Sequence, residues 1–124
     1  MRVVAEILVG LVAALHVYIL IMEMFLWTTP RVRAAFGSTV EFAEQTKVLA
    51  ANQGLYNGFL AAGLIWGLIA SDPVGRAAMI FFTTCVVVAG CYGAATASRR
   101  ILLVQALPGA VALVAVLLAG SQAS

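Results

Sequence analysis

Charged residues are scarce in this sequence. Asp, Glu, Lys and Arg make up 10% of its 124 residues, against about 25% in a typical soluble domain. Hydrophobic residues make up 64%, and the mean hydropathy is +1.08. A soluble domain of this size has too much surface per volume to hide so many apolar side chains. The composition therefore predicts a single integral membrane domain over residues 1–124, and the net charge of +2 is too small to indicate a nucleic-acid partner.

Metal-binding and disulfide motifs are also missing. The chain has one histidine and two cysteines, and it contains no CxxC motif. Cys85 and Cys91 are six residues apart in one apolar run, so on a helix they face different directions and cannot pair. We therefore expect no metal site, and we interpret both cysteines as small buried hydrophobic residues.

Long apolar runs are present instead, and they have the length of membrane helices. Four such runs cover residues 3–27, 49–71, 77–97 and 101–119, each close to the ~20 residues needed to cross the hydrocarbon. None shows a sustained alternation of period two, which argues against strands. A polar segment, residues 28–48, separates the first two runs, and short turns at residues 71–75 and 98–100 separate the others. We predict an all-α fold: an antiparallel bundle of four transmembrane helices that forms a homo-oligomer in the lipid bilayer.

Proline and capping residues predict where these helices end. Pro30 follows the first apolar run and is expected to stop its helix. Ser38 and Glu41 have the spacing of a capping box, which predicts that the second helix begins near Thr39. Pro108 lies inside the fourth run and removes a backbone donor, so we expect a local kink there.

The Lys and Arg residues outside the spans predict the orientation in the membrane. The cytoplasmic side is expected to carry the larger number of them. Both termini are therefore predicted to lie outside the cytoplasm. The side assigned to the cytoplasm would hold Arg31, Arg33, Lys47, Arg99 and Arg100, and the other side Arg2 and Arg76.

Two ionisable residues, His16 and Glu23, lie within the first apolar run. They are seven residues apart, so they share one face of a helix and are separated by roughly 10 Å along its axis. A charged group near the centre of the bilayer costs at least ~2.5 kcal/mol. This face must therefore meet protein, water or a ligand, and the separation is too long for a direct hydrogen bond between the two side chains. Glu23, Tyr56 and His16 are the candidates for acid–base chemistry.

Polar side chains in the other runs are expected to gather at the depth of Glu23, on the cytoplasmic side. Because antiparallel spans run in opposite directions, residues far apart in the sequence reach the same level, with His16 deeper. These side chains predict a ligand-binding pocket, but amides and hydroxyls also serve as interhelical contacts in membrane proteins. The predicted ligand-binding residues are His16, Glu23, Asn52, Gln53, Tyr56, Asn57, Tyr92 and Gln105.

The second run also has a stripe of small residues. Gly54, Gly58 and Ala62 recur every four residues, a spacing that lets two membrane helices approach closely. We interpret this stripe as a packing surface for another helix.

The pattern resembles a known family of small bacterial four-span membrane proteins, filed under domain of unknown function 1304. The resemblance lies in EMFLW at residues 23–27, NQGLYNGFLAAGL at residues 52–64, AGCYG at residues 89–93, and Gln105 with Pro108. It covers nearly the whole chain. It implies a four-helix membrane protein of the bacterial plasma (inner) membrane, and it implies no activity, because none is established for the family.

The chain is also weakly similar to styrene oxide isomerases, which have four spans as well. That likeness implies a haem ligated by a histidine that enters the second span, with an asparagine a short way on. Here the second run offers Asn52 and Asn57 but no histidine, and His16 lies in the first run. Haem is therefore not the cofactor we expect, and the cofactor stays unknown.

Three functions fit these observations. The first is binding or carrying a small apolar or lipid-like molecule, with Glu23 and His16 setting the charge of the pocket. The second is an intramembrane enzyme, an isomerase or hydrolase of an apolar substrate such as an epoxide. The third is a structural or accessory membrane subunit, in which the polar residues only join helices.

Overall fold

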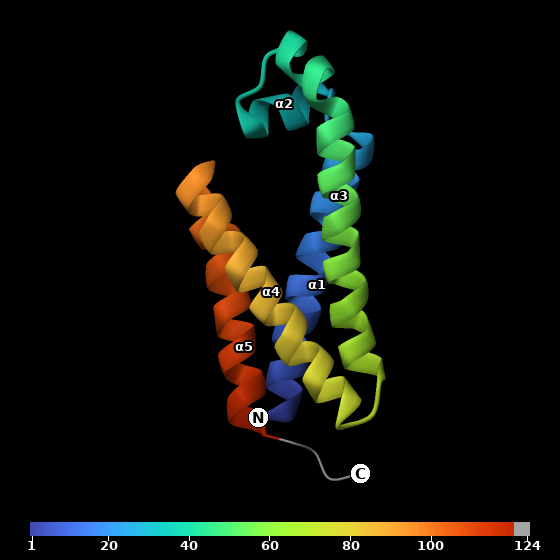
Figure 1. Ribbon diagram of the computed structural model, residues 1–124, viewed down its shortest axis with the longest axis vertical. Coiled ribbons are helices and arrows are strands. Elements are labelled where there is room, and N and C mark those ends of the chain that lie inside the picture. The colour runs from blue at the N-terminus through green and yellow to red at the C-terminus, as the bar shows by residue number, and fades with distance from the viewer. Residues whose placement is uncertain (121–124) are drawn as a thin grey trace. The chain divides into compact units, whose positions relative to one another are not determined.

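Helices make up the part of the chain that the computed structural model describes, residues 1–120. No strand occurs within those residues, so the all-α prediction is confirmed for them. Figure 1 shows the helices in chain order. They are α1 (Arg2–Phe25), α2 (Pro30–Phe36), α3 (Val40–Ile69), α4 (Val74–Thr96), a π-helical segment η1 (Leu102–Ala106) and α5 (Leu107–Ala119).

Three stretches are long and apolar enough to cross a membrane: Arg2–Phe25, Val74–Thr96 and Leu102–Ala119. They correspond to the predicted spans at residues 3–27, 77–97 and 101–119, and they make the chain an integral membrane protein. The predicted span at residues 49–71 falls in α3, which is not among them. The 30 residues of α3 include charged side chains in the first turns and amides in the middle, which lower its apolar character.

The polar segment between α1 and α3 contains a helix that was not predicted. The helix α1 ends at Phe25, and Pro30 is the first residue of α2, so the prediction that Pro30 stops the first helix is wrong. Proline is favoured at a helix start because the N–H that it lacks would have no helical partner there. The Thr29 hydroxyl accepts a hydrogen bond from the backbone N–H of Val32 (3.5 Å), which completes this start.

The capping box predicted at Ser38 is also wrong, by one residue. The hydroxyl of Thr39 caps α3 by accepting a hydrogen bond from the N–H of Phe42 (3.1 Å). The N–H of Ser38 instead donates to the carbonyl of Arg33 (2.9 Å) at the end of α2. Ser38 therefore belongs to the end of one helix, and its neighbour starts the next.

The disturbance expected at Pro108 takes the form of a π-helical turn. The N–H of Leu107 bonds to the carbonyl of Leu102, five residues earlier. A proline ring clashes with the carbonyl four residues before it, which here belongs to Val104. A wider turn relieves this clash, and π-turns inside helices are a recognised cause of bends.

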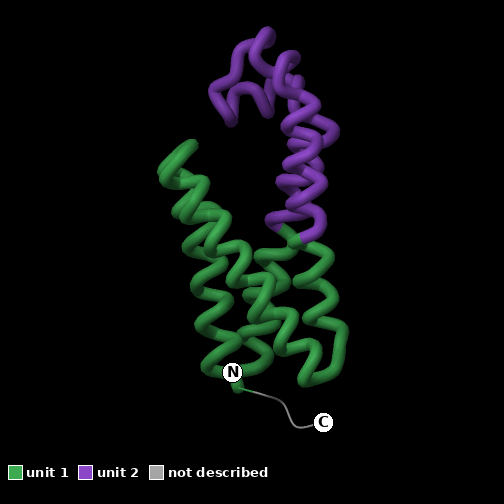
Figure 2. Tube along the Cα trace, in the orientation of Figure 1, with its two compact units in different colours: residues 1–14, 60–124 green, residues 15–59 purple. Residues whose placement is uncertain are grey.

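The chain forms two compact units, which Figure 2 shows in different colours. Unit 1 comprises Met1–Ala14 and the chain from Leu60 onward, and unit 2 comprises Leu15–Phe59. Both α1 and α3 therefore contribute to each unit. We describe the two units separately.

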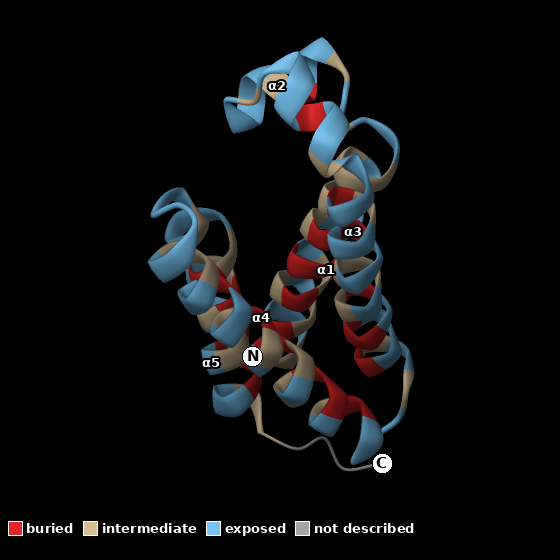
Figure 3. Cartoon of the chain, turned by 45° about the horizontal axis from the view of Figure 1, so that its top comes forward, coloured by how far each residue is buried: buried red, intermediate tan, exposed pale blue. Residues whose placement is uncertain are grey.

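Unit 1 is a packed helical bundle made from the start of α1, the end of α3, α4 and α5. Its core joins residues from all four helices, and buried positions are red in Figure 3. Small residues bring the helices together: a Cβ atom on Gly90 of α4 would lie 2.6 Å from the backbone nitrogen of Ala106. The core residues are Ala5, Val9, Val12, Ala13, Leu64, Met79, Val86, Ala112, Ala115 and Val116.

An ion-pair network ties the start of α1 to the turn before α4 in unit 1. Both terminal nitrogens of Arg2 donate to the carboxylate of Asp72, each at 2.8 Å. The Arg2 Nε also donates to Glu6 at 3.0 Å, and Asp72 Oδ1 accepts from the backbone N–H of Arg76 (3.1 Å). The Asp72 side chain is only 4% exposed. Sequence reasoning treated Arg2 only as a charge that sets orientation and missed this network.

Candidate functional site

The candidate site lies in unit 2, where the last turns of α1 pack against the middle of α3. The side-chain nitrogen Nδ2 of Asn57, on α3, donates to Oε1 of Glu23, on α1, at 2.7 Å. The same nitrogen also donates to the backbone carbonyl of Gln53 at 3.0 Å. This second bond holds the amide against its own helix, so the structure fixes the direction from which the amide approaches the carboxylate.

The close approach of α1 and α3 at this point depends on two glycines. A Cβ atom on Gly54 would lie 2.7 Å from Cγ of Met24 and 3.1 Å from Cβ of Glu23. A Cβ atom on Gly58, one turn on, would lie 2.5 Å from Cδ1 of Leu20. The packing role predicted for these two glycines is therefore what unit 2 shows. It lets the Glu23 side chain lie beside the backbone of α3.

The third member of the predicted stripe does not continue it. Ala62 is exposed, whereas Ala61 is 2% exposed. The buried face therefore passes through Ala61, which follows Gly58 by three residues, because an α-helix has 3.6 residues per turn and a strict spacing of four drifts around it.

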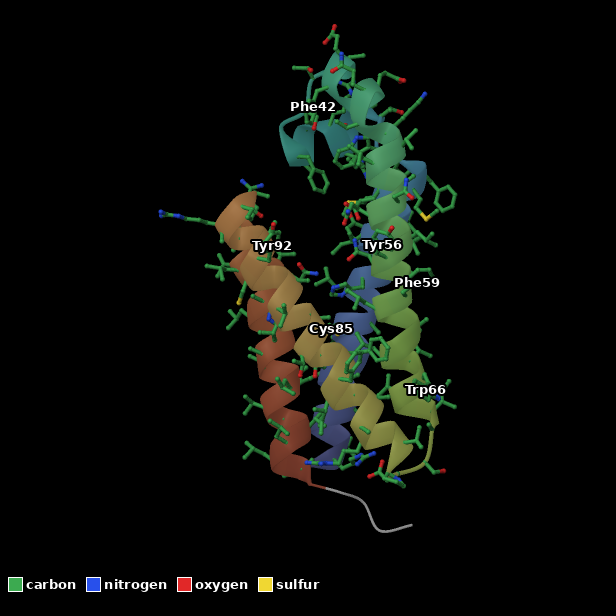
Figure 4. All side chains as sticks on the ribbon, in the orientation of Figure 1. Phe42, Tyr56, Phe59, Trp66, Cys85 and Tyr92 are labelled. Carbon is green, nitrogen blue, oxygen red and sulfur yellow. The ribbon has the colours of Figure 1, made fainter. Side chains whose placement is uncertain are left out.

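Asn52 and Tyr56 lie away from the contact with α1. Each precedes a glycine of that contact by two residues, which is about 200° around a helix. Tyr56 is 53% exposed, and its ring is 6.2 Å from that of Phe59 (Figure 4). Asn52 is exposed and donates from Nδ2 to the carbonyl of Val48, on its own helix, at 2.8 Å. Unit 2 thus brings Asn57 to Glu23 but not Asn52 or Tyr56.

His16, Tyr92 and Gln105 occupy three different settings. His16 is fully buried in α1 and has an interaction partner. Tyr92, on α4 in unit 1, is 72% exposed. Gln105 is half-buried in η1, also in unit 1, and has a partner too. Their predicted roles in ligand binding stay predictions.

Trp27 and Thr46 form a polar contact just beyond the site. The sequence analysis did not predict this contact. The indole nitrogen of Trp27 donates to the hydroxyl of Thr46 at 3.1 Å, and the Trp27 ring lies 5.0 Å from that of Phe36. These contacts fold the segment after α1 back against the start of α3. A tryptophan followed by a threonine 19 residues later carries no sequence signal that would reveal the pair.

Comparison with known proteins gives a family. The family described as "Protein of unknown function (DUF1304)" matches residues 10–117. The chain belongs to the DUF1304 family. The resemblance inferred from residues 52–64 and the other motifs is thereby confirmed.

The chain is similar in sequence to the "Uncharacterized protein YpaA" of Lactococcus lactis subsp. lactis (strain IL1403). It is 30% identical over 110 residues, which cover 85% of this chain and 89% of the relative. No solved structure matches. Membership of DUF1304 therefore carries no activity over to this chain, and any function must be argued from its own residues.

The chemistry available to this DUF1304 protein at the site centres on one carboxylate. Among residues 1–120 the ion pairs join Arg2 to Glu6, Arg2 to Asp72, and Lys47 to Glu44. Glu23 is in none of them. Nor do the described residues contain a group of three His, Cys, Asp or Glu side chains that could hold a metal ion. The arrangement can accept hydrogen bonds or hold a positive charge.

Proposed function

We propose that this protein binds or carries a small apolar or lipid-like molecule whose polar end is held by Glu23 and Asn57. The observation that carries the proposal is a half-buried carboxylate, within an apolar helix, whose protein partner is an amide and not a cation. A buried charge costs several kcal/mol unless it is compensated. A ligand that completes the hydrogen bonding of Glu23 would compensate it.

The proposal includes the finer membrane arrangement. We propose that α3 crosses the bilayer as a fourth span over residues 49–71. Asn57 of α3 bonds to Glu23 near the end of α1, and Asp72, just after α3, bonds to Arg2 at the start of α1, so α3 runs back along a helix that is long enough to cross. With four spans both termini lie on the same side, which we propose is the side away from the cytoplasm. We also propose that the membrane is a bacterial plasma membrane and that copies of the chain associate as a homo-oligomer. Of the other predicted ligand-binding residues, His16 and Gln53 also lie in unit 2, and we propose that they help to orient the ligand.

The experiment that tests this function is native mass spectrometry of the protein released from mild detergent. We expect the wild-type protein to retain a discrete extra mass. Loss of the Glu23 carboxylate needs to cost only about 1.4 kcal/mol of binding free energy to lower the affinity tenfold. We therefore expect Glu23→Gln to retain no more than about one-tenth of the bound mass. The matched control is Glu41→Gln, which makes the same chemical change at an exposed carboxylate in the first turn of α3. A bound mass that persists equally in Glu23→Gln, or no bound mass in any mild detergent, would contradict the proposal.

A structural subunit is the second candidate, and the bond between Asn57 and Glu23 favours it too, because it joins two helices. Glutamine at position 23 keeps an oxygen that can accept this bond, so Glu23→Gln should leave the helix contact intact. Under the structural alternative Glu23→Gln has no binding to lose. Asn57→Leu, which removes the donor, should then lower stability by about 0.6–2 kcal/mol, the range for hydrogen bonds between membrane helices.

A further inference from the structure

We propose that the molecule held at Glu23 is an amphiphilic organic cation, a protonated amine or quaternary ammonium group on an apolar body. This inference rests on the proposed function and names its ligand class. It comes from the distribution of charge over the described residues.

The acidic residues divide into those with a compensating charge and those without. The chain has five Asp and Glu residues. Arg2 pairs with Glu6 and Asp72, and Lys47 pairs with Glu44. Glu41 and Glu23 remain, and Glu41 is exposed in the first turn of α3, where a helix N-terminus favours negative charge. Glu23 is the acidic residue that lies within an apolar span and has no cation beside it among residues 1–120.

One oxygen of the Glu23 carboxylate, Oε2, accepts no hydrogen bond from the described residues and can accept one from a ligand. Asn57 donates to Oε1, and no other protein donor reaches the carboxylate within the described chain. A neutral alcohol could donate to Oε2, but it would not hold Glu23 in its ionised form in apolar surroundings. A cation supplies both the donor and the opposite charge, and charge-assisted hydrogen bonds are about twice as strong as neutral ones. An anionic ligand would be repelled.

The surroundings of Glu23 select an organic cation over a metal ion. Leu20 and Met24 lie near Glu23 on α1, and their side chains pack against Gly58 and Gly54 of α3, so apolar groups surround the carboxylate on this side. Calcium or magnesium would require about six oxygen ligands, whereas this site offers one carboxylate and no acidic cluster among the described residues. Apolar and polarisable side chains beside a single carboxylate match a ligand with one positive group on a hydrocarbon body.

The test compares three probes that share one hydrocarbon cage: 1-adamantylammonium, 1-adamantanol and 1-adamantanecarboxylate. Binding to the full chain in nanodiscs of zwitterionic phosphatidylcholine is measured by calorimetry, with empty nanodiscs as the baseline for partition into lipid. We expect the wild-type protein to bind the ammonium at least about tenfold more tightly than the alcohol, and the carboxylate most weakly.

Variants at Glu23 and Glu41 test whether the preference for the ammonium probe depends on the carboxylate of Glu23. Glu23→Gln should lower the ammonium affinity to that of the alcohol, while Glu23→Asp, which keeps the charge, should retain a preference for the ammonium. Glu41→Gln should match the wild-type protein for all three probes. Circular dichroism and gel filtration of each variant exclude loss of folding as the cause.

The outcomes separate this inference from the proposed function. If the alcohol binds as tightly as the ammonium and Glu23→Gln changes neither, the cation is overturned and apolar ligand binding stands. If none of the three probes binds above the empty nanodiscs and native mass spectrometry shows no bound mass, the proposed function falls as well.

Discussion

Replacing Asp72 by asparagine is expected to lower the free energy of unfolding by about 1.5–3 kcal/mol, the range for hydrogen bonds to charged groups. The carboxylate is 4% exposed and receives two hydrogen bonds of 2.8 Å from Arg2. Asparagine has nearly the same shape and caps a helix as well as aspartate does, so the bond from the N–H of Arg76 can be kept. The loss therefore reports the charge on Arg2, which keeps only the partly exposed Glu6 as its acidic partner.

Glu6→Gln is the matched control for Asp72→Asn. Glu6 makes one bond to Arg2, and its side chain is 40% exposed, so we expect a loss of no more than about 1 kcal/mol. Both variants are measured by titration with sodium dodecyl sulfate from a mild detergent, with circular dichroism as the readout. Equal stability of the two variants would show that the pair with Asp72 is not what stabilises this end of unit 1.

Replacing Gly90 by alanine is the second change with a large expected effect. The added Cβ would lie 2.6 Å from the nitrogen and 2.8 Å from the Cα atom of Ala106. These are backbone atoms, which can move only if α4 and η1 separate. Alanine gains about 1 kcal/mol of helix propensity over glycine, but overpacking typically costs about 1–3 kcal/mol, occasionally more. Because the clash here is with backbone, we take the upper end of that range, about 3 kcal/mol. The net expectation is then a loss of about 2 kcal/mol in the free energy of unfolding.

Gly93→Ala, one turn further along α4, is the control for Gly90→Ala. A Cβ on Gly93 would lie 3.1 Å from Cδ1 of Ile101, the end of a flexible side chain that can turn aside. The gain in propensity should then offset the contact to within about 1 kcal/mol. The same detergent titration compares the two variants. If Gly90→Ala proves as stable as Gly93→Ala, the close contact between α4 and η1 does not limit the packing of unit 1.

Hydrophobic run length was enough to locate most of the membrane helices. The runs at residues 3–27, 77–97 and 101–119 match α1, α4 and η1 with α5 to within a few residues. Helix ends were harder, because they depend on which of several neighbouring groups caps the backbone. Both Ser38 and Thr39 can cap a helix, and only the folded chain shows that Thr39 does so while Ser38 bonds to the end of α2.

The candidate site could be predicted in part. Burial cost indicated His16 and Glu23, and the amide-rich stretch of α3 gave Asn57 as one of several candidates, but the pairing of Asn57 with Glu23 depends on how α3 is rotated against α1. The glycines at positions 54 and 58 were the signal for that rotation, since they mark the face that contacts α1. The pairing of Arg2 with Asp72 could not be read in this way, because 70 residues separate them.

The π-helical turn η1 also affects how this chain can vary in length. A π-turn holds about one residue more than an α-turn, and one extra residue in an α-helix would rotate all later residues by about 100°. By absorbing that residue, η1 keeps Gly109, Ala112 and Val116 on the buried face of α5. A relative shorter by one residue in this stretch, and without the proline, would present the same face from an unbroken α-helix. The turn η1 is therefore the place in this span where the chain can lose a residue while α5 keeps its rotational phase.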